Sequence, residues 1–510
     1  MIIIDGNRLT IEQMVAVSRH GVKVRISSEA EKAINKSRAM VCRLVETGEV
    51  VYGITTGFGK LSNVIISKEQ TAQLQNNLIR SHAVGVGEML SEEVIRAIML
   101  LRANTLAKGN SGIRLSVLQT LIEMLNKGIH PLVPCQGSVG ASGDLVPLAH
   151  MALPLIGEGE VIYEGVRMDG AGALKLAGIS PVVLDAKEGL ALINGTAVMT
   201  AIAALAVYDS EVLLDTADIA AAMTIEALRG ITEAFDENIN LVRPHPGQIR
   251  SAENLRSILA GSELISSVGE YRIQDPYSLR CTPQVHGASR DAVAYTRRVV
   301  EIEINSATDN PLIFPPLDKV ISAGNFHGQP VALAMDFLGI AMSEIANIAN
   351  CRISQLLASE LKELPPFLIK DSGLNSGCML TQYTAAALVS ENKVLASPAS
   401  VDSIPTSAYQ EDHVSMGTIA ARKARNILEN TTNVMAIELF CSAQAFEFYF
   451  PCRLGEGTKK AYDCIRSRVS ILEKDRVMYN DVKQIVDLIK SGLIAQKVFG
   501  VSQCLACESS

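Results

Sequence analysis

Residues 137–147 read Gly-Ser-Val-Gly-Ala-Ser-Gly-Asp-Leu-Val-Pro, and most of what the sequence predicts follows from this stretch. Its centre, Ala141-Ser142-Gly143, can close into a ring if the amide nitrogen of Gly143 attacks the carbonyl carbon of Ala141. Glycine offers an unhindered nitrogen and a permissive backbone. The Ser142 hydroxyl then leaves as water, and the resulting exocyclic methylene is an electrophile that no ordinary side chain provides. The ordinary alternative for so short a pattern is a glycine-rich turn before a helix.

Composition limits the class of protein. The chain has 510 residues, of which 48% are hydrophobic and 20% charged, and its net charge is -8. A chain of this length can bury one large core or two to three domains. Because it has an acidic excess and no basic run, nucleic acid is not expected as a partner. The first residues lack the features of a signal peptide, and the apolar stretches 197–207 and 340–350 are shorter than the roughly 20 residues of a membrane span.

The cysteines favour a cytoplasmic protein with reduced thiols. All ten are scattered singly except for Cys504 and Cys507. A single CxxC without a second pair is a weak pattern for a metal site or a redox pair, and a scattered set does not predict a disulfide framework.

Helical patterns dominate the chain. Ser28-Glu29-Ala30-Glu31 has the form of a capping box, and the helix that it opens is expected to end at Gly48. Further helices are expected from Ser67 toward Arg80, from Ser91 to Gly109 and over 115–127. After Gly195 the patterns lengthen, and four long helices are predicted over 196–229, 283–304, 330–361 and 412–446.

These patterns predict a mainly α fold with a long central helix bundle. Long alanine-rich helices pack as bundles, and helices that are apolar all round lie at the centre. Strand signals are few, at Val50–Tyr52 and in a hairpin over 160–168 that turns at Glu164-Gly165. We expect a smaller N-terminal α+β domain over 1–195, which carries the Ala-Ser-Gly loop, and a long-helix bundle over 196–510.

The loops between the helices concentrate polar residues, as binding loops on a rigid scaffold do. No loop is specific alone, since a tyrosine before a glycine turn is usually packing and a lone histidine is usually structural. No Walker A, Rossmann, HExxH or Gly-x-Ser-x-Gly pattern occurs, which excludes the commonest nucleotide, zinc-protease and hydrolase sites. The loops lie at 52–59, 81–83, 194–196, 274–280, 325–327 and 410–413.

Taken together and in this order, the motifs resemble the aromatic amino-acid ammonia-lyases, whose prosthetic group is methylidene-imidazolone, and within them the branch that acts on histidine. His82 after Ser81 and Glu411 in QEDH are the features of that branch. The motifs extend over nearly the whole chain and are YGITTGFG (52–59), NLIRSHAVGVG (77–87), GSVGASGDLVPLAH (137–150), KEGLALINGT (187–196), IQDPYSLRC (273–281), TDNPLIF (308–314), SAGNFHGQP (322–330), PPFL (365–368), NSGCM (375–379), SENK (390–393) and VDSIPTSAYQEDHVSMG (401–417).

The resemblance implies an ammonia-lyase/fumarase-like fold and a self-made prosthetic group. Ala141, Ser142 and Gly143 would form methylidene-imidazolone autocatalytically, with no metal or diffusible cofactor. Tyr52 would be the general base that removes the β-proton, if its pKa falls from about 10 toward working pH. Arg280 would bind the substrate carboxylate, to which a planar guanidinium offers a bidentate fork.

The resemblance also assigns the remaining site residues. Asn194 and Gln274 would orient the electrophile and the carboxylate. Tyr277, which we count as catalytic, and Phe326 would line the reacting centre. His82 and Glu411 would hold the imidazole ring, and Glu411 is counted as both catalytic and substrate-binding. Helix N-termini, one of them at Asp144-Leu145, would place partial positive charge near the electrophile.

Two residues depart from the histidine branch, in which Asn is usual at both positions: Thr55, and Tyr409 before Gln410-Glu411. They leave open a tyrosine or phenylalanine lyase, a 2,3-aminomutase or a lyase for a modified histidine. A helical scaffold without catalysis is the alternative from another class. The expected function is elimination of ammonia from L-histidine to give trans-urocanate, the first step of histidine degradation. The expected enzyme is a homotetramer with shared active sites, without nucleic acid or membrane partners.

Overall fold

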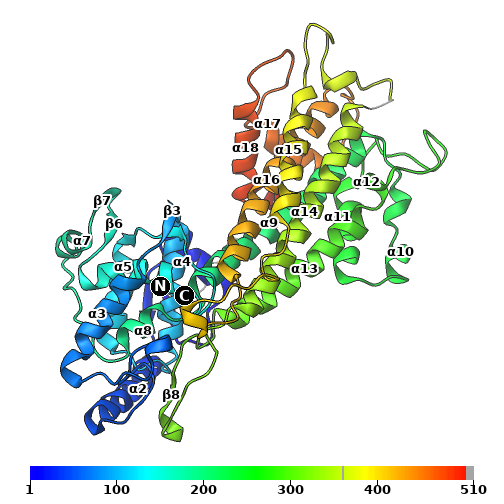
Figure 1. Cartoon of the computed structure of the whole chain (residues 1–510). Coiled ribbons are helices and arrows are strands. Elements are labelled where there is room, and N and C mark those ends of the chain that lie inside the picture. Colours follow the sequence, from blue (N-terminus) through cyan, green and yellow to red (C-terminus); the bar gives the residue numbers. More distant parts are fainter. Residues whose placement is uncertain (359–360, 501–510) are drawn as a thin grey trace. The chain divides into compact units, whose positions relative to one another are not determined.

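A computed structural model describes residues 1–358 and 361–500, so the Cys504/Cys507 pair lies outside the described residues. These residues form 19 α-helices and nine short strands, which confirms the mainly α fold (Figure 1). They divide into two compact units. The first contains residues 1–205, 297–335 and 398–422, and the second contains the intervening segments 206–296 and 336–397 and the C-terminal part from 423. The domain boundary expected at residue 195 stays a prediction.

The first unit holds the nine strands and eight of the helices. The helices are α1 (Ile11–His20), α2 (Ser28–Thr47), α3 (Thr71–His82), α4 (Glu92–Ala107), α5 (Leu115–Lys127), α6 (Leu145–Ala152), α7 (Gly170–Leu176) and α8 (Glu188–Ile193). The strands are β1 (Ile2–Ile4), β2 (Val24–Ile26), β3 (Val86–Met89), β4 (His130–Pro131), β5 (Pro134–Gln136), β6 (Glu160–Tyr163), β7 (Val166–Asp169), β8 (Leu312–Phe314) and β9 (Lys319–Ile321).

The strands make four small sheets. β1 pairs with β2 in parallel, β3 with β5 antiparallel, and β8 with β9 antiparallel. The third sheet has the antiparallel order β4-β6-β7, and its β6–β7 hairpin turns at Glu164-Gly165, as the sequence predicts. Helix α4 supplies much of the core, because every residue from Val94 to Ala107 is buried.

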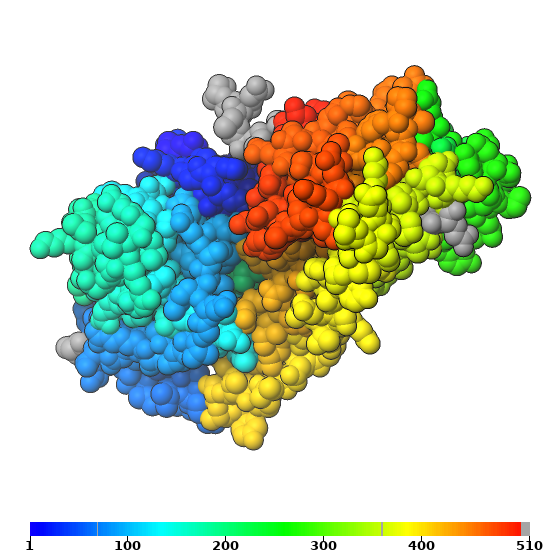
Figure 2. Space-filling model, turned by 90° about the horizontal axis from the view of Figure 1, so that it is seen from above, coloured from blue at the N-terminus to red at the C-terminus, as the bar shows by residue number. Residues whose placement is uncertain are grey.

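Four long helices continue from the first unit into the second. They are α9 (Ala197–Ala227), α13 (Thr282–Glu303), α14 (Gln329–Leu357) and α16 (Gly417–Phe446), close to the ranges expected from the sequence. The other helices of the second unit are α10 (Glu237–Leu241), α11 (Pro246–Leu259), α12 (Tyr277–Arg280), α15 (Met379–Leu395), α17 (Glu456–Arg466), α18 (Tyr479–Lys490) and α19 (Leu493–Phe499). α15 (yellow) lies at the surface in Figure 2, and few of its residues are buried.

Within the second unit, buried polar pairs join the long helices. Asp218 of α9 bonds to His286 of α13 at 2.8 Å, and Arg352 of α14 pairs with Glu438 of α16 at 2.5 Å. Thr224 of α9 also donates to Glu438 at 2.9 Å. The four side chains are fully buried, so each needs its partner. Burial lowers the pKa of His286, so its contact with Asp218 is a hydrogen bond of a neutral ring, whereas Arg352 and Glu438 form an ion pair.

By length and composition, α9 and α14 are apolar enough to cross a membrane, although the stretches singled out in the sequence are shorter. However, 83% and 72% of their most apolar windows are buried by the rest of the chain. Core helices of a globular protein have this property, so these two helices are weak evidence for a membrane span.

The structure corrects three local predictions. Ser27, rather than Ser28, caps α2 by accepting from the Ala30 N–H. Residues 50–52 are not a strand, because Ile54 and Thr55 donate to the Val51 carbonyl and turn the chain. α16 begins at Gly417 rather than at 412, since Met416 has a left-handed φ of 55°.

Candidate functional site

The Ala-Ser-Gly turn is held against the chain that follows α8. Gly195 N–H donates to the Ser142 carbonyl at 3.2 Å, and Asp144 N–H donates to the Gly195 carbonyl at 2.7 Å. A Cβ added at Gly143, whose φ is 71°, would lie 2.1 Å from that Gly195 oxygen. A side chain is therefore excluded at Gly143, and the tight turn of small residues suits the ring closure that the sequence predicts.

Asp144 connects this turn to two helix N-termini. It is the N-cap residue of α6, and its Oδ2 accepts from the Val198 and Met199 N–H groups in the first turn of α9, both at 2.9 Å. The other oxygen accepts from Thr418 and, at 3.2 Å, from Ser138. The predicted helix start after the tripeptide is thus confirmed. Both N-termini carry partial positive charge next to the tripeptide.

A cavity of about 840 Å³ opens beside the tripeptide. Six predicted residues line it, and all of them belong to the first unit: Tyr52, His82, Ser142, Asn194, Phe326 and Glu411. The elements that supply them are separated in sequence by up to several hundred residues. The structure therefore brings together the predicted base, the hydroxyl that would leave, and the predicted ring-binding pair.

Tyr52 is anchored through its hydroxyl. The Gly59 N–H donates to Tyr52 Oη at 3.1 Å, across the turns that join residue 52 to the short 3-10 helix η1 (Gly59–Leu61). This contact fixes the position of the Tyr52 hydroxyl, which lines the cavity beside Ser142.

Glu411 is held by two hydroxyl groups. Ser142 Oγ donates to Glu411 Oε1 at 2.9 Å, and Thr406 Oγ1 donates to Oε2 at 2.8 Å. The backbones of Thr406 and Glu411 also pair with each other. Between them, η7 (Ser407–Tyr409) has left-handed φ angles of 51° to 65° at all three residues. This turn fixes the direction of the Glu411 carboxylate.

His82 is the last residue of α3, and its Nδ1 lies 3.1 Å from Ser81 Oγ. Burial lowers the pKa of His82, while a hydrogen bond at the Leu78 backbone and the charge of Glu411 raise it by less. The imidazole is therefore neutral at neutral pH, and one of its ring nitrogens can form a hydrogen bond with a ring bound in the cavity.

The two departures from the histidine branch do not line the cavity in the part of the chain that the structure describes. Thr55 Oγ1 donates to the Glu49 carbonyl at 2.7 Å and accepts from the Val51 N–H at 2.9 Å. Tyr409 is 79% exposed. Thr55 thus stabilises the 49–55 turn, and neither side chain narrows the cavity of its own chain.

Three predicted site residues belong to the second unit: Gln274, Tyr277 and Arg280. None of them is among the described residues that line the cavity. Gln274 and Tyr277 are exposed, and the Arg280 guanidinium lies over the Tyr277 ring at 4.9 Å. Arg280 Nε is buried and has no partner among the residues described.

The sequence reasoning missed several lining residues. Asn77 of α3, Asn310 and Ser322 contribute polar groups to the cavity but were not candidates. Asn77 is the first residue of the NLIRSHAVGVG motif and Ser322 the first of SAGNFHGQP, so the motifs could have indicated both. Asn310 lies within the TDNPLIF motif, which could have indicated it.

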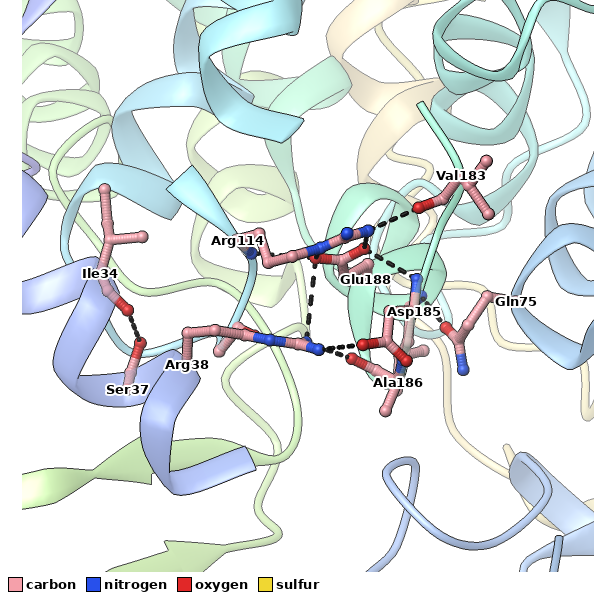
Figure 3. A network of polar contacts seen from close by, with 11 residues as sticks. Ile34, Ser37, Arg38, Gln75, Arg114, Val183, Asp185, Ala186 and Glu188 are labelled. Atoms are coloured by element: carbon pink, nitrogen blue, oxygen red, sulfur yellow. Dashed lines mark hydrogen bonds and ion pairs between the residues drawn. The ribbon is translucent and has the colours of Figure 1, made fainter. Parts of the chain in front are cut away.

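The short helix α8, which leads into Asn194, is anchored by a buried carboxylate. Glu188 is fully buried and accepts from the side chain of Arg114 at 2.7 and 2.5 Å (Figure 3). Arg38 of α2 bonds to Asp185 at 2.5 Å and lies 3.8 Å from Glu188. These pairs fix the start of α8 and hence the approach of residues 194 and 195 to the tripeptide.

No group of three or more His, Cys, Asp or Glu side chains that could hold a metal ion occurs in the described ranges. The eight cysteines within them form no disulfide with one another.

Comparisons with known proteins agree with the motifs. The family model described as "Aromatic amino acid lyase" matches residues 9–467. A histidine ammonia-lyase from Alkaliphilus oremlandii is 61% identical over 497 residues, which are 98% of each chain. The crystal structure of histidine ammonia-lyase from Trypanosoma cruzi superposes with a TM-score of 0.92 at 42% identity, and the match covers 100% of this chain and 98% of that one. The crystal structure of a tyrosine aminomutase from Streptomyces globisporus superposes with a TM-score of 0.94 at 38% sequence identity, and the match covers 98% of this chain and 99% of that one.

Proposed function

Because the chain belongs to the aromatic amino acid lyase family, we propose that it eliminates ammonia from L-histidine to give trans-urocanate. The observation that carries this proposal is the cavity in which Tyr52, Ser142, His82 and Glu411 meet. High identity to histidine ammonia-lyases over nearly the whole chain supports the choice of substrate.

The residues of the turn fit methylidene-imidazolone. Only glycine can occupy position 143, and the Ser142 hydroxyl faces the cavity and contacts Glu411. When formed, the group supplies an electrophile that activates the α-amine as a leaving group. Because its formation removes the Ser142 hydroxyl, Glu411 Oε1 loses a hydrogen-bond donor and becomes free to accept another.

The substrate ring would bind between His82 and Glu411. The Glu411 carboxylate accepts an imidazole N–H, and the neutral His82 ring provides a second hydrogen bond. Tyr52, with its hydroxyl held by the Gly59 N–H, removes the β-proton. A phenylalanine side chain offers no hydrogen-bond donor to the half-buried Glu411 carboxylate. A tyrosine hydroxyl is a donor, so the choice of histidine over tyrosine rests on the identity to histidine ammonia-lyases.

We also propose that Gln274, Tyr277 and Arg280 serve the cavity of another copy in a cytoplasmic homotetramer with shared sites. The support is that the buried Arg280 Nε has no hydrogen-bond partner among the residues described. Arg280 would bind the substrate carboxylate through paired N–H groups.

One experiment tests the reaction. Purified protein is incubated separately with L-histidine, L-tyrosine, L-phenylalanine and the trimethylated histidine betaine, and the absorbance of a conjugated acid is followed. We expect an increase with histidine. An increase with tyrosine alone would overturn the choice of histidine as the substrate. No increase with any of the four compounds would favour the alternative of a helical scaffold without catalysis.

A second experiment tests the shared site. Tyr52→Phe and Arg280→Met proteins are each inactive if both residues are needed. If they act in different chains around one site, mixed oligomers contain some sites with both residues intact and regain activity. If the two variants exchange chains and the mixture still has no activity, the proposal of a shared site is wrong.

A further inference from the structure

A set of buried contacts fixes which way the side-chain amide of Asn194 points. Its Nδ2 donates to Asp309 Oδ1 and to the Asn310 carbonyl, both at 3.2 Å. An ionised carboxylate and a carbonyl can only accept hydrogen bonds. Since both N–H bonds of the amide are used on this side, the amide oxygen must point the other way. Asn194 lines the cavity, and its amide oxygen, which these two bonds do not occupy, is the group that it can offer to a substrate there.

Asp309 cannot easily turn away from Asn194. Lys187 Nζ bonds to Asp309 Oδ2 at 2.8 Å, and both side chains are fully buried. The Asn310 N–H donates to Asp309 Oδ1 at 2.7 Å. If the Asp309 carboxylate turned away from these donors, it would stay buried without the hydrogen bonds that offset its desolvation. The Lys187–Asp309 pair is therefore held in one arrangement.

The backbone around Asn194 is fixed as well. The fully buried guanidinium of Arg102 donates through Nη1 to the Asn194 carbonyl at 2.8 Å and to the Thr308 carbonyl at 3.2 Å. Arg102 and Lys187 place two positive charges beside one carboxylate. The Lys187 ammonium and the Asn310 N–H are donors only, so the Asp309 carboxylate accepts from both of them as well as from Asn194.

We propose that the Lys187–Asp309 pair positions Asn194 with its amide oxygen toward the cavity, where it accepts a hydrogen bond from the substrate amine. The expectation that Asn194 orients the electrophile or the carboxylate then changes. An oxygen attracts an ammonium or amine N–H and repels a carboxylate. This inference rests on the proposed function and specifies which group of the amino acid Asn194 recognises.

A mutant cycle tests the positioning role. Its first variant is Asn194→Ala, its second combines Lys187→Gln with Asp309→Asn so that no unpaired charge remains buried, and its third combines all three changes. We expect kcat/KM to fall about 10²- to 10³-fold for the first variant and about 10²-fold for the second. If Asp309 acts through Asn194, the third variant falls no further than the first.

Two reversible inhibitors test which atom of Asn194 faces the substrate. Histamine has the imidazole and the amine but no carboxylate, and imidazolepropionate has the carboxylate but no amine. We expect Asn194→Ala to weaken histamine binding about tenfold and to leave imidazolepropionate binding nearly unchanged. The opposite pattern, or equal effects on both compounds, would overturn the assignment of the oxygen.

The matched control is another buried ion pair. Arg352→Met with Glu438→Gln removes a pair in the second unit and should leave kcat/KM of the folded protein within about threefold of wild type. Losses that multiply in the Asn194/Asp309/Lys187 cycle would refute the positioning role. A wild-type protein that does not convert histidine would instead refute the proposed function, so the two failures are distinguishable.

Discussion

Replacing Asp144 with asparagine tests the electrostatics of the turn that carries the tripeptide. Asp144 is fully buried, and burial raises its pKa to about 6, against the lowering effect of hydrogen bonds from Thr418, Met199, Ser138 and Val198. An Asp in an unfolded chain has a pKa of about 3.9. The difference of about two units corresponds to about 3 kcal/mol.

The sign of the effect follows from proton binding. Because folded Asp144 holds its proton more tightly than unfolded Asp144, its contribution is most favourable below pH about 4 and is lost as the pH rises through about 6. At pH 8 the Asp144 carboxylate therefore makes the free energy of unfolding about 3 kcal/mol smaller than it is below pH about 4.

Asp144→Asn removes this titration and keeps an oxygen for the Val198 and Met199 N–H groups. We therefore expect the free energy of unfolding of wild type to fall relative to the variant by about 2 kcal/mol between pH 4 and pH 8. Urea unfolding of both proteins at the two pH values measures this difference. The Asp144 charge also raises the pKa of the buried Glu303, so its removal changes the Glu303 contribution in the same direction. Asp463→Asn, which changes an exposed carboxylate, is the control. A wild-type-to-variant difference that stays constant with pH would refute the reasoning.

Three further predictions follow from the geometry. Tyr52→Phe keeps the fold but lowers the rate of elimination by about 10²- to 10⁴-fold, as the absorbance assay measures; near-normal turnover would remove Tyr52 from the role of base. Gly143→Ala places a Cβ 2.1 Å from the Gly195 oxygen at a left-handed φ of 71°, so intact-mass measurement should find the variant undehydrated, and a dehydrated variant would show that this turn tolerates a side chain. Arg352→Met leaves the Glu438 carboxylate buried and unpaired, which should lower the free energy of unfolding by about 3–5 kcal/mol; an effect below about 1 kcal/mol in urea would mean that Glu438 is not desolvated as described.

Local signals in the sequence predicted most of the helices. The αL glycines at 48 and 128 end α2 and α5 where expected, and α9 extends over nearly its predicted range. The errors arose where adjacent residues compete. Ser27 and Ser28 are both possible caps, and only the backbone geometry decides that Ser27 accepts the Ala30 N–H.

The failed strand at 50–52 shows a different limit. Val50, Val51 and Tyr52 have high strand propensity, but the Thr55 hydroxyl bonds back to Glu49 and Val51 and closes a turn. A side-chain contact of this kind competes with pairing and is not visible in propensity.

The motifs predicted which residues belong to the site, but the sequence could not predict the geometry of the site. Ser142 and Glu411 are 269 residues apart, and Lys187 and Asp309 are 122 apart. Only the fold shows that these pairs bond, that the charged pair is buried, and that the Asn194 amide therefore has one direction. Sequence periodicity gives no information about contacts between residues so far apart in the chain.

The intact mass of the freshly purified wild-type chain tests the central claim most directly. Ring closure at Ala141 expels the carbonyl oxygen as water, and loss of the Ser142 hydroxyl expels a second water. The account predicts a mass lower than that of the 510-residue sequence by two water molecules, with the loss located by peptide mapping to the segment that contains residues 141–143. A chain that has the full mass of its sequence and still converts histidine would contradict the account.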